Sequence, residues 1–159
     1  MLDANVFIEA HKRYYAFDLC PGYWAALLSH HHGGRLCSIG RVRDELVGKG
    51  DPLSDWVHGM PDSFFAETGD PSISALFGKV VTWVQAQPQY LAAAKAAFAA
   101  GADGWLIAYA KAQSLIVATD EIPNPDIKRR VPIPNVCDAF GVEYLDTFKL
   151  LRTLGVRFS

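Results

Sequence analysis

Four acidic residues stand where carboxylates can hold a divalent metal: Asp3, Glu45, Asp103 and Asp120. Two like charges about 4 Å apart repel by roughly 4 kcal/mol at an effective dielectric near 20, so such a cluster is unfavourable without a cation. Hard oxygen ligands favour Mg²⁺ or Mn²⁺ over zinc. A metal held in this way can deprotonate a water molecule and stabilise charge on a phosphodiester during hydrolysis.

The strands that are expected before two of these acids decide whether the acids meet. Asp3 follows the expected end of a short first strand, and Asp120 closes an apolar run at 115–119. In parallel α/β proteins, ligands bind at the carboxyl ends of the strands. We therefore expect both acids to face one crevice, together with Asn5 and with Glu121, which is a candidate for an additional ligand.

The other two acids are expected on helices. Asp103 precedes an apolar stripe that begins at Leu106, and packing of that stripe would hold the carboxylate at the rim of the crevice. Glu45 lies between Val42 and Leu46, at the edge of another apolar stripe. Taken singly, these acids are explained equally well as helix caps, turn residues or solvated side chains, so their weight as a metal site lies in the combination.

Apolar periodicity predicts an alternation of strands and helices. Short buried strands are expected at 36–39, 115–118 and 143–145. Helices are expected at 21–29, around 42–46, and at 72–87, 90–112, 135–140 and 147–154. The glycines of Gly101-Ala102-Asp103-Gly104 should divide the long fourth stretch into an Ala-rich arm and a separate helix. The alternation predicts a three-layer α/β/α domain with a central parallel sheet and an added helical arm.

Length and composition bound the function classes. The chain has 159 residues, half of them apolar, which predicts a single domain over 1–159. Its net charge of −2 argues against binding nucleic acid by global attraction, so any RNA contact must be local. Lys128, Arg129 and Arg130 form a short basic run that is a candidate for such a contact. The sequence has no long apolar run and no signal-like start, so we expect a cytoplasmic protein without membrane contact.

Four segments of the sequence resemble the PIN-domain nucleases, in the order and spacing of that family. They are Asp3-Ala4-Asn5-Val6-Phe7-Ile8, Arg41-Val42-Arg43-Asp44-Glu45-Leu46, Asp103-Gly104-Trp105-Leu106-Ile107-Ala108 and Val117-Ala118-Thr119-Asp120. The resemblance is to the branch that contains the virulence-associated protein C toxins. A further signature, Tyr14-Tyr15 to Phe17-Asp18 and Pro21-Gly22-Tyr23-Trp24, is similar to an uncharacterised PIN-like subfamily.

This resemblance implies a PIN-like fold and a metal-dependent endoribonuclease, the toxin of a type II toxin–antitoxin pair. It implies that the four acids ligate Mg²⁺ or Mn²⁺ and that Asn5 and Thr119 orient water or ligand. Hydrolysis of RNA would then leave a 5′-phosphate. An antitoxin protein as partner and a homodimer are implied in the same way.

Two other functions remain open from the sequence. A Mg²⁺-dependent phosphatase or phosphotransferase also carries an early aspartate after a strand, although such enzymes need a second aspartate where Asn5 stands. A catalytically silent PIN-like binding module would keep the fold and bind a partner through the added arm. Trapping of an aspartyl-phosphate would favour the first alternative, and partner binding that survives loss of the acids would favour the second.

Overall fold

The computed structural model describes residues 1–158, which form a mixed α/β protein made of two compact units. Unit 1 comprises Met1–Ala66, Ala118–Asp120 and the chain from Leu145 onward. Unit 2 comprises Glu67–Val117 and Glu121–Tyr144. The mixed α/β class agrees with the prediction, whereas the three-layer arrangement and the single domain over 1–159 stay predictions.

Unit 1 is built on a short parallel array of extended segments. β1 (Ser38–Ile39) pairs in parallel with β2 (Phe65–Ala66). At the other edge of β1 lies segment 1–3, where the Leu2 N–H donates to the Cys37 carbonyl over 2.9 Å. The buried Ser38 hydroxyl donates to the Leu2 carbonyl over 2.7 Å, which fixes the same two segments through a side chain.

The array continues from segment 1–3 to the strands that come late in the chain. Leu2 forms a parallel bridge with Ala118 of β3 (Val117–Ala118), and the Asp3 N–H donates to the Ala118 carbonyl over 3.0 Å. The Thr119 N–H donates to the carbonyl of Leu145, the second residue of β4 (Tyr144–Leu145), over 2.9 Å. The spatial order is therefore β2, β1, segment 1–3, β3 and β4.

This order contains a topological switch point. Numbered along the chain from segment 1–3, the segments lie in the order 3-2-1-4-5, so the chain goes one way from segment 1–3 to β1 and returns to the other side as β3. Ligand sites of open α/β sheets lie at the carboxyl ends of the two strands on either side of such a point. Here those ends are followed by Asp3 and by Thr119 and Asp120.

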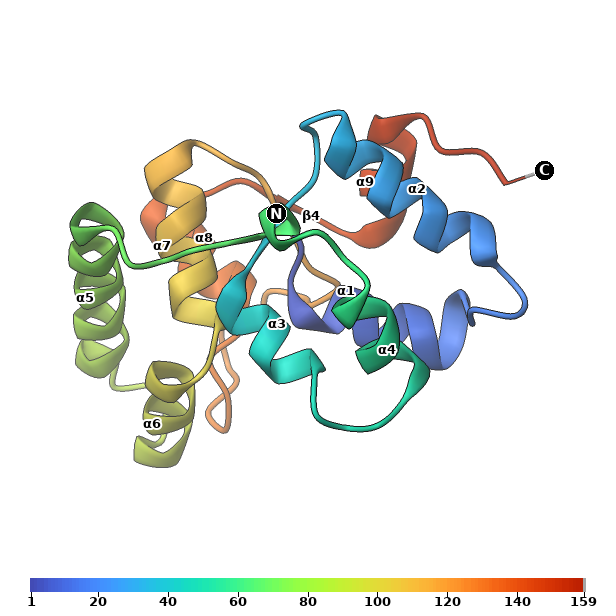
Figure 1. Ribbon diagram of the computed structural model, residues 1–159. Coiled ribbons are helices and arrows are strands. Elements are labelled where there is room, and N and C mark those ends of the chain that lie inside the picture. Colours follow the sequence, from blue (N-terminus) through green and yellow to red (C-terminus); the bar gives the residue numbers. More distant parts are fainter. Residues whose placement is uncertain (159) are drawn as a thin grey trace. The chain divides into compact units, whose positions relative to one another are not determined.

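The helices of unit 1 bury an aromatic core. They are α1 (Ala4–Glu9), which continues as a π-helical turn over Ala10–Tyr14, α2 (Pro21–His32), α3 (Gly40–Leu46), α4 (Pro52–His58) and α9 (Thr147–Leu154). Phe7 of α1 packs against Trp56 of α4 and against Phe64, with ring centroids 5.9 and 6.3 Å apart. In Figure 1, α9 lies beside α2, and the Arg35 guanidinium that follows α2 donates to the Thr153 carbonyl.

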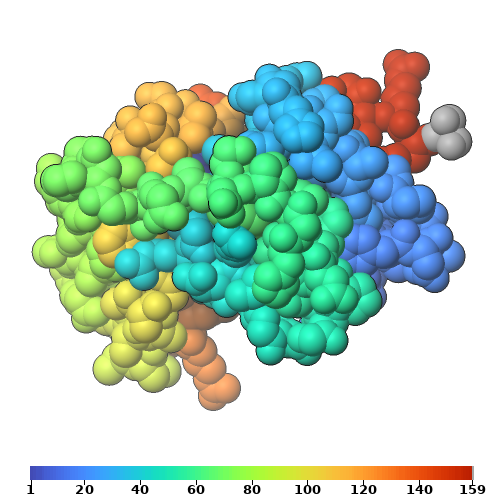
Figure 2. Space-filling model, in the orientation of Figure 1, coloured from blue at the N-terminus to red at the C-terminus, as the bar shows by residue number. Residues whose placement is uncertain are grey.

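Unit 2 is helical apart from its loops and its ends at β3 and β4. α5 (Pro71–Ala86) and α7 (Asp103–Gln113) lie side by side, with α6 (Ala92–Ala100) and α8 (Ile133–Phe140) packed against them (Figure 1). Both α5 and α8 begin with a proline in their first turn, a position where the missing N–H costs no helical hydrogen bond. The loop between β3 and α8, drawn in orange, projects from the surface in Figure 2.

Most predicted elements are confirmed, with shorter strands. Strands expected at 36–39, 115–118 and 143–145 are β1, β3 and β4, each two residues long. The predicted break at Gly101–Gly104 separates α6 from α7, and the last predicted helix matches α9. The prediction missed α1, α4 and β2. Within residues 1–158, no helix has both the length and the apolar character of a membrane span.

Gly104 tests the packing of α7 on α5 and α6. A Cβ at this position would lie 3.0 Å from Phe77 and 3.1 Å from Phe98, and Phe77 is itself stacked on Trp105. We expect Gly104→Ala to destabilise the protein by about 1–2 kcal/mol, because overpacking outweighs the better helix propensity of alanine. Urea unfolding measures this change.

The matched control for this prediction is Gly78→Ala in α5. Its Cβ would meet nothing within 4 Å, so the substitution should stabilise the protein by up to about 1 kcal/mol. If both alanine variants were stabilised to the same extent, the described packing around Gly104 would be wrong.

Candidate functional site

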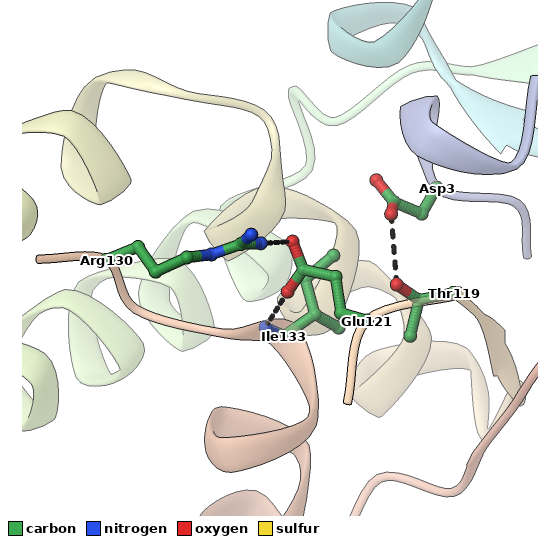
Figure 3. A network of polar contacts seen from close by, with 5 residues as sticks. All are labelled: Asp3, Thr119, Glu121, Arg130 and Ile133. Carbon is green, nitrogen blue, oxygen red and sulfur yellow. Dashed lines mark hydrogen bonds and ion pairs between the residues drawn. The ribbon is translucent and has the colours of Figure 1, made fainter. Parts of the chain in front are cut away.

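Asp3 is a buried carboxylate at the centre of the array. Only 1% of the residue is exposed, and it connects segment 1–3 to the start of α1. The Thr119 hydroxyl donates to its Oδ2 over 3.0 Å, as the dashed line in Figure 3 shows. The ends of segment 1–3 and β3 therefore lie side by side in unit 1, with Thr119 as the direct partner of Asp3. That Asp3 and Asp120 face one crevice stays a prediction.

Burial makes the negative charge of Asp3 costly. Loss of hydration raises the pKa of Asp3 from 3.8 to about 6. The Thr119 hydroxyl and the backbone N–H groups of Asn5 and Ala4 lower this pKa, but they compensate only in part, and the charge of Glu45 raises it further. Asn5 thus acts on Asp3 through its main chain, from the first turn of α1. A cation beside Asp3 would supply the compensation that these groups leave incomplete.

Glu45 reaches the surroundings of Asp3 from α3. The helix is fixed by Val42 and Leu46, both buried, and leaves Glu45 exposed. Its influence on the pKa of Asp3 shows that the two carboxylates lie within electrostatic range in unit 1. This agrees with the placement of Glu45 at the edge of a buried stripe.

Asp120 holds the start of α9. Its Oδ1 accepts from the Thr147 N–H and its Oδ2 from the Thr147 hydroxyl, both over 2.8 Å. The first N–H groups of a helix lack intrahelical acceptors, and a carboxylate there is also favoured by the helix dipole. Asp120 therefore has a structural task within unit 1, and a carboxylate with four lone-pair positions can still accept a further ligand.

Two tyrosines lie in the electrostatic field of Asp120. Tyr23 is fully buried, and its ring is stacked on Tyr15 with centroids 4.3 Å apart. Burial raises the pKa of both phenols, and the charge of Asp120 adds to the effect in each case. The Tyr23 hydroxyl has no hydrogen-bond partner among the described residues. Neither tyrosine was proposed from the sequence as part of the site.

Asp103 belongs to unit 2, where it is the first residue of α7. Ala102 precedes the helix, and Asp103 lies in its first turn, where an acidic side chain is favoured by the helix dipole. Its side chain lines a depression of about 160 Å³ together with Arg129 and Arg130. Apolar side chains of α6 form the rest of its wall with Val131: Ala94, Ala97 and Phe98. Unit 2 thus brings Asp103 together with two of the three predicted RNA-binding residues.

Glu121 organises the loop that carries this basic run. Its Oε2 accepts from the Ile133 N–H at the start of α8 over 2.7 Å, and its Oε1 forms an ion pair with Arg130 (Figure 3). Arg130 is thereby engaged in an ion pair, although it is exposed like Lys128 and Arg129. The loop is held at a second point, where the Lys128 carbonyl accepts from the Leu91 N–H over 2.9 Å.

The predicted acids are therefore distributed over both units. Asp3, Glu45 and Asp120 belong to unit 1, and Asp103 and Glu121 to unit 2. Across residues 1–158, no group of three or more His, Cys, Asp or Glu side chains is arranged so that it could hold a metal ion. The Mg²⁺ or Mn²⁺ site remains a prediction.

Comparison with protein families matches residues 1–158 to one family, described as Domain of unknown function (DUF4411). Comparison with curated proteins and with solved structures yields no match. The resemblance to PIN-domain nucleases thus stays an expectation from the sequence.

The raised pKa of Asp3 predicts a pH-dependent stability. Because the folded state holds this proton more tightly than the unfolded state, the contribution is complete below pH 3.8 and is lost as pH rises through about 6. The pKa difference corresponds to roughly 3 kcal/mol. We expect Asp3→Asn, measured by urea unfolding in EDTA, to gain stability over wild type between pH 4 and pH 7 by an amount of this order.

Asp44→Asn is the matched control, since Asp44 is an exposed acid on α3. Its stability should follow that of wild type across the same pH range. Parallel pH profiles for wild type and Asp3→Asn would show that the Asp3 carboxylate is not desolvated as described.

Proposed function

This chain belongs to the family described as a domain of unknown function (DUF4411), and from its own residues we propose that it is a metal-dependent endoribonuclease. In this proposal it hydrolyses RNA phosphodiester bonds with Mg²⁺ or Mn²⁺. The observation that carries the proposal is the buried carboxylate of Asp3 at the switch point of the array, within range of the charge of Glu45. A protein that needed only a polar residue there would be more stable with a neutral one.

The donor chemistry of these residues fits a hard divalent cation. Asp3, Glu45 and Asp120 supply carboxylate oxygens, which Mg²⁺ and Mn²⁺ prefer. A cation at Asp3 would offset both the lost hydration and the repulsion from Glu45. Asp103 enters the ligand set through the sequence resemblance. When bound, the metal would supply Lewis-acid stabilisation of the phosphodiester and a lowered pKa for water.

The contacts of Asp3 fix the orientation of its carboxylate before any metal binds. The Thr119 hydroxyl holds Oδ2, and the N–H groups at the start of α1 present partial positive charge, so the carboxylate has a fixed orientation. Asp120 is fixed by its two hydrogen bonds to Thr147. Side chains that are already oriented lose little entropy when they bind a ligand.

RNA would be held by local contacts. The exposed Lys128 and Arg129 lie on a projecting loop, and Arg129 lines the same depression as Asp103. Such cations fix the position of the phosphate backbone without reading the sequence. With so few cations, binding should weaken only modestly as salt concentration rises.

The biological setting of the proposal follows from the sequence resemblance. It is the toxin of a type II toxin–antitoxin pair, with an antitoxin protein as partner and a homodimeric state. Each of these can be tested separately from the chemistry.

An RNA-cleavage assay of the protein in the presence of Mn²⁺ tests the proposed activity. We expect Asp3→Asn, Glu45→Gln and Asp103→Asn each to lose activity by on the order of 100-fold or more, since even outer-shell partners of metal sites cost 10–100-fold. The products should carry 5′-phosphate and 3′-hydroxyl ends. A contaminating metal-independent ribonuclease would instead leave cyclic phosphates and would be insensitive to EDTA.

Asp44→Asn is again the sharpest control, because Asp44 and Glu45 are exposed neighbours on one helix. It should retain the activity of wild type. Cleavage that persists in Asp3→Asn at the wild-type rate would refute the proposal, and so would equal losses in Asp44→Asn and Glu45→Gln.

A further inference from the structure

Three exposed aromatic side chains gather in unit 1, within the part of the chain that the structure describes. Tyr14 is 56% exposed, Phe148 50% and Phe158 48%. Tyr14 and Phe148 form an edge-to-face pair with centroids 6.2 Å apart, although they are 134 positions apart along the chain. Phe158 contacts Tyr15 with centroids 5.7 Å apart. Contiguous exposed aromatic surface is unfavourable in water and often marks a binding site.

The position of Tyr14 is fixed by the contacts of its neighbour Tyr15. Tyr15 is stacked on the buried Tyr23 with an angle of only 3° between the ring planes. The Trp24 indole donates to the Tyr15 carbonyl over 2.7 Å, and the Tyr15 N–H donates to the Ala10 carbonyl over the same distance. These contacts fix the backbone at Tyr14 and Tyr15. The exposed Tyr14 side chain therefore extends from a fixed segment of backbone.

Phe148 is held beside one of the proposed metal ligands. It follows Thr147, whose N–H and hydroxyl both donate to Asp120. The hydrogen bonds that fix the start of α9 thus also fix the aromatic pair next to the carboxyl end of β3. Within unit 1, Phe148 directly follows the residue that binds Asp120, and Phe148 in turn contacts Tyr14.

Cations alternate with these aromatics along the chain. Lys12 and Arg13 precede Tyr14, Lys149 follows Phe148, and Arg157 precedes Phe158. Arg13 pairs with Glu9 at 3.1 Å and Lys149 with Asp146 at 3.7 Å, both at the surface. Surface ion pairs are weak, so either cation can exchange its partner for a phosphate. Aromatic rings flanked by cations match the two parts of a single nucleic-acid strand, its bases and its phosphates.

We propose that Tyr14 and Phe148 form a stacking platform for an unpaired base, so that the protein binds single-stranded RNA in preference to a duplex. The platform rests on the proposed nuclease function, since its place beside Asp120 would bring the phosphate next to the stacked base toward the strand-end acids. A base in a duplex is already stacked on its neighbours and does not expose its face to the two rings.

Binding without cleavage tests the platform. A short fluorescent single-stranded RNA rich in adenine is titrated in EDTA with wild type and with the double variant Tyr14→Leu/Phe148→Leu. Leucine keeps an apolar side chain but lacks the π face. We expect the double variant to bind roughly 10-fold more weakly or worse, because stacking contributes substantially for every base bound.

Two controls separate stacking from folding and from general surface effects. The double variant Tyr14→Phe/Phe148→Tyr keeps both rings and should bind within about threefold of wild type. Leu19→Ser removes a side chain that is 78% exposed in unit 1 and has no part in the proposed platform or in the metal site, so it should leave binding unchanged. The same RNA annealed to its complement should bind wild type more weakly than the free strand.

The outcomes for the platform and for the nuclease are distinguishable. Equal RNA binding by wild type and the leucine variant would overturn the platform even if Mn²⁺-dependent cleavage is found, and so would duplex binding as tight as single-strand binding. The aromatic face would then fit a protein partner instead. Ring-dependent binding without any cleavage would uphold the platform and refute the nuclease.

Discussion

The buried carboxylate of Asp3 is the constraint on which the architecture of unit 1 depends. A carboxylate removed from water must be compensated, and the groups available here are one hydroxyl and the N–H groups at the start of α1. They compensate in part, so the pKa of Asp3 stays well above its usual value. The array around it, with segment 1–3 between β1 and β3, places this costly group at the point where open α/β sheets bind ligands. A stability cost at such a place is typical of sites that have been shaped for a ligand.

Asp120 shows how one residue can serve both structure and site. By accepting hydrogen bonds from the N–H and hydroxyl of Thr147 it fixes the start of α9, and its charge also raises the pKa of Tyr15 and Tyr23. Removing its side chain would therefore remove a helix anchor together with a proposed metal ligand. Asn at this position keeps one acceptor for the Thr147 N–H, so it separates the two roles better than Ala.

Elements with a strong local signal could be predicted from the sequence, whereas pairings between distant segments could not. The break at Gly101–Gly104 and the apolar stripes of α5, α7 and α9 are local signals, because each is contained in its own short segment of the sequence. These helices are found where the pattern predicts them. β2 is only two residues long, and its pairing with β1 depends on register between segments more than twenty residues apart, which apolar periodicity does not encode.

The same limit applies to the candidate site. The four acids could be selected by type and position, and the partnership of Asp3 with Glu45 is consistent with that selection. The Asp120–Thr147 hydrogen bonds and the Tyr14–Phe148 pair join residues 27 and 134 positions apart, so only the fold reveals them. The position of Glu121 after Asp120 suggests a ligand, whereas its hydrogen bond to Ile133 and its ion pair with Arg130 give it a structural role.

The most direct measurement of the central claim is the number of protons released when Mn²⁺ binds. Calorimetric titration at pH 6 in buffers of different ionisation enthalpy gives this number. If Asp3 is a ligand with a pKa of about 6, wild type should release roughly half a proton more than Asp3→Asn, because the metal displaces the proton from the carboxyl group. Equal proton release by the two proteins, or Mn²⁺ binding of equal affinity, would contradict the account.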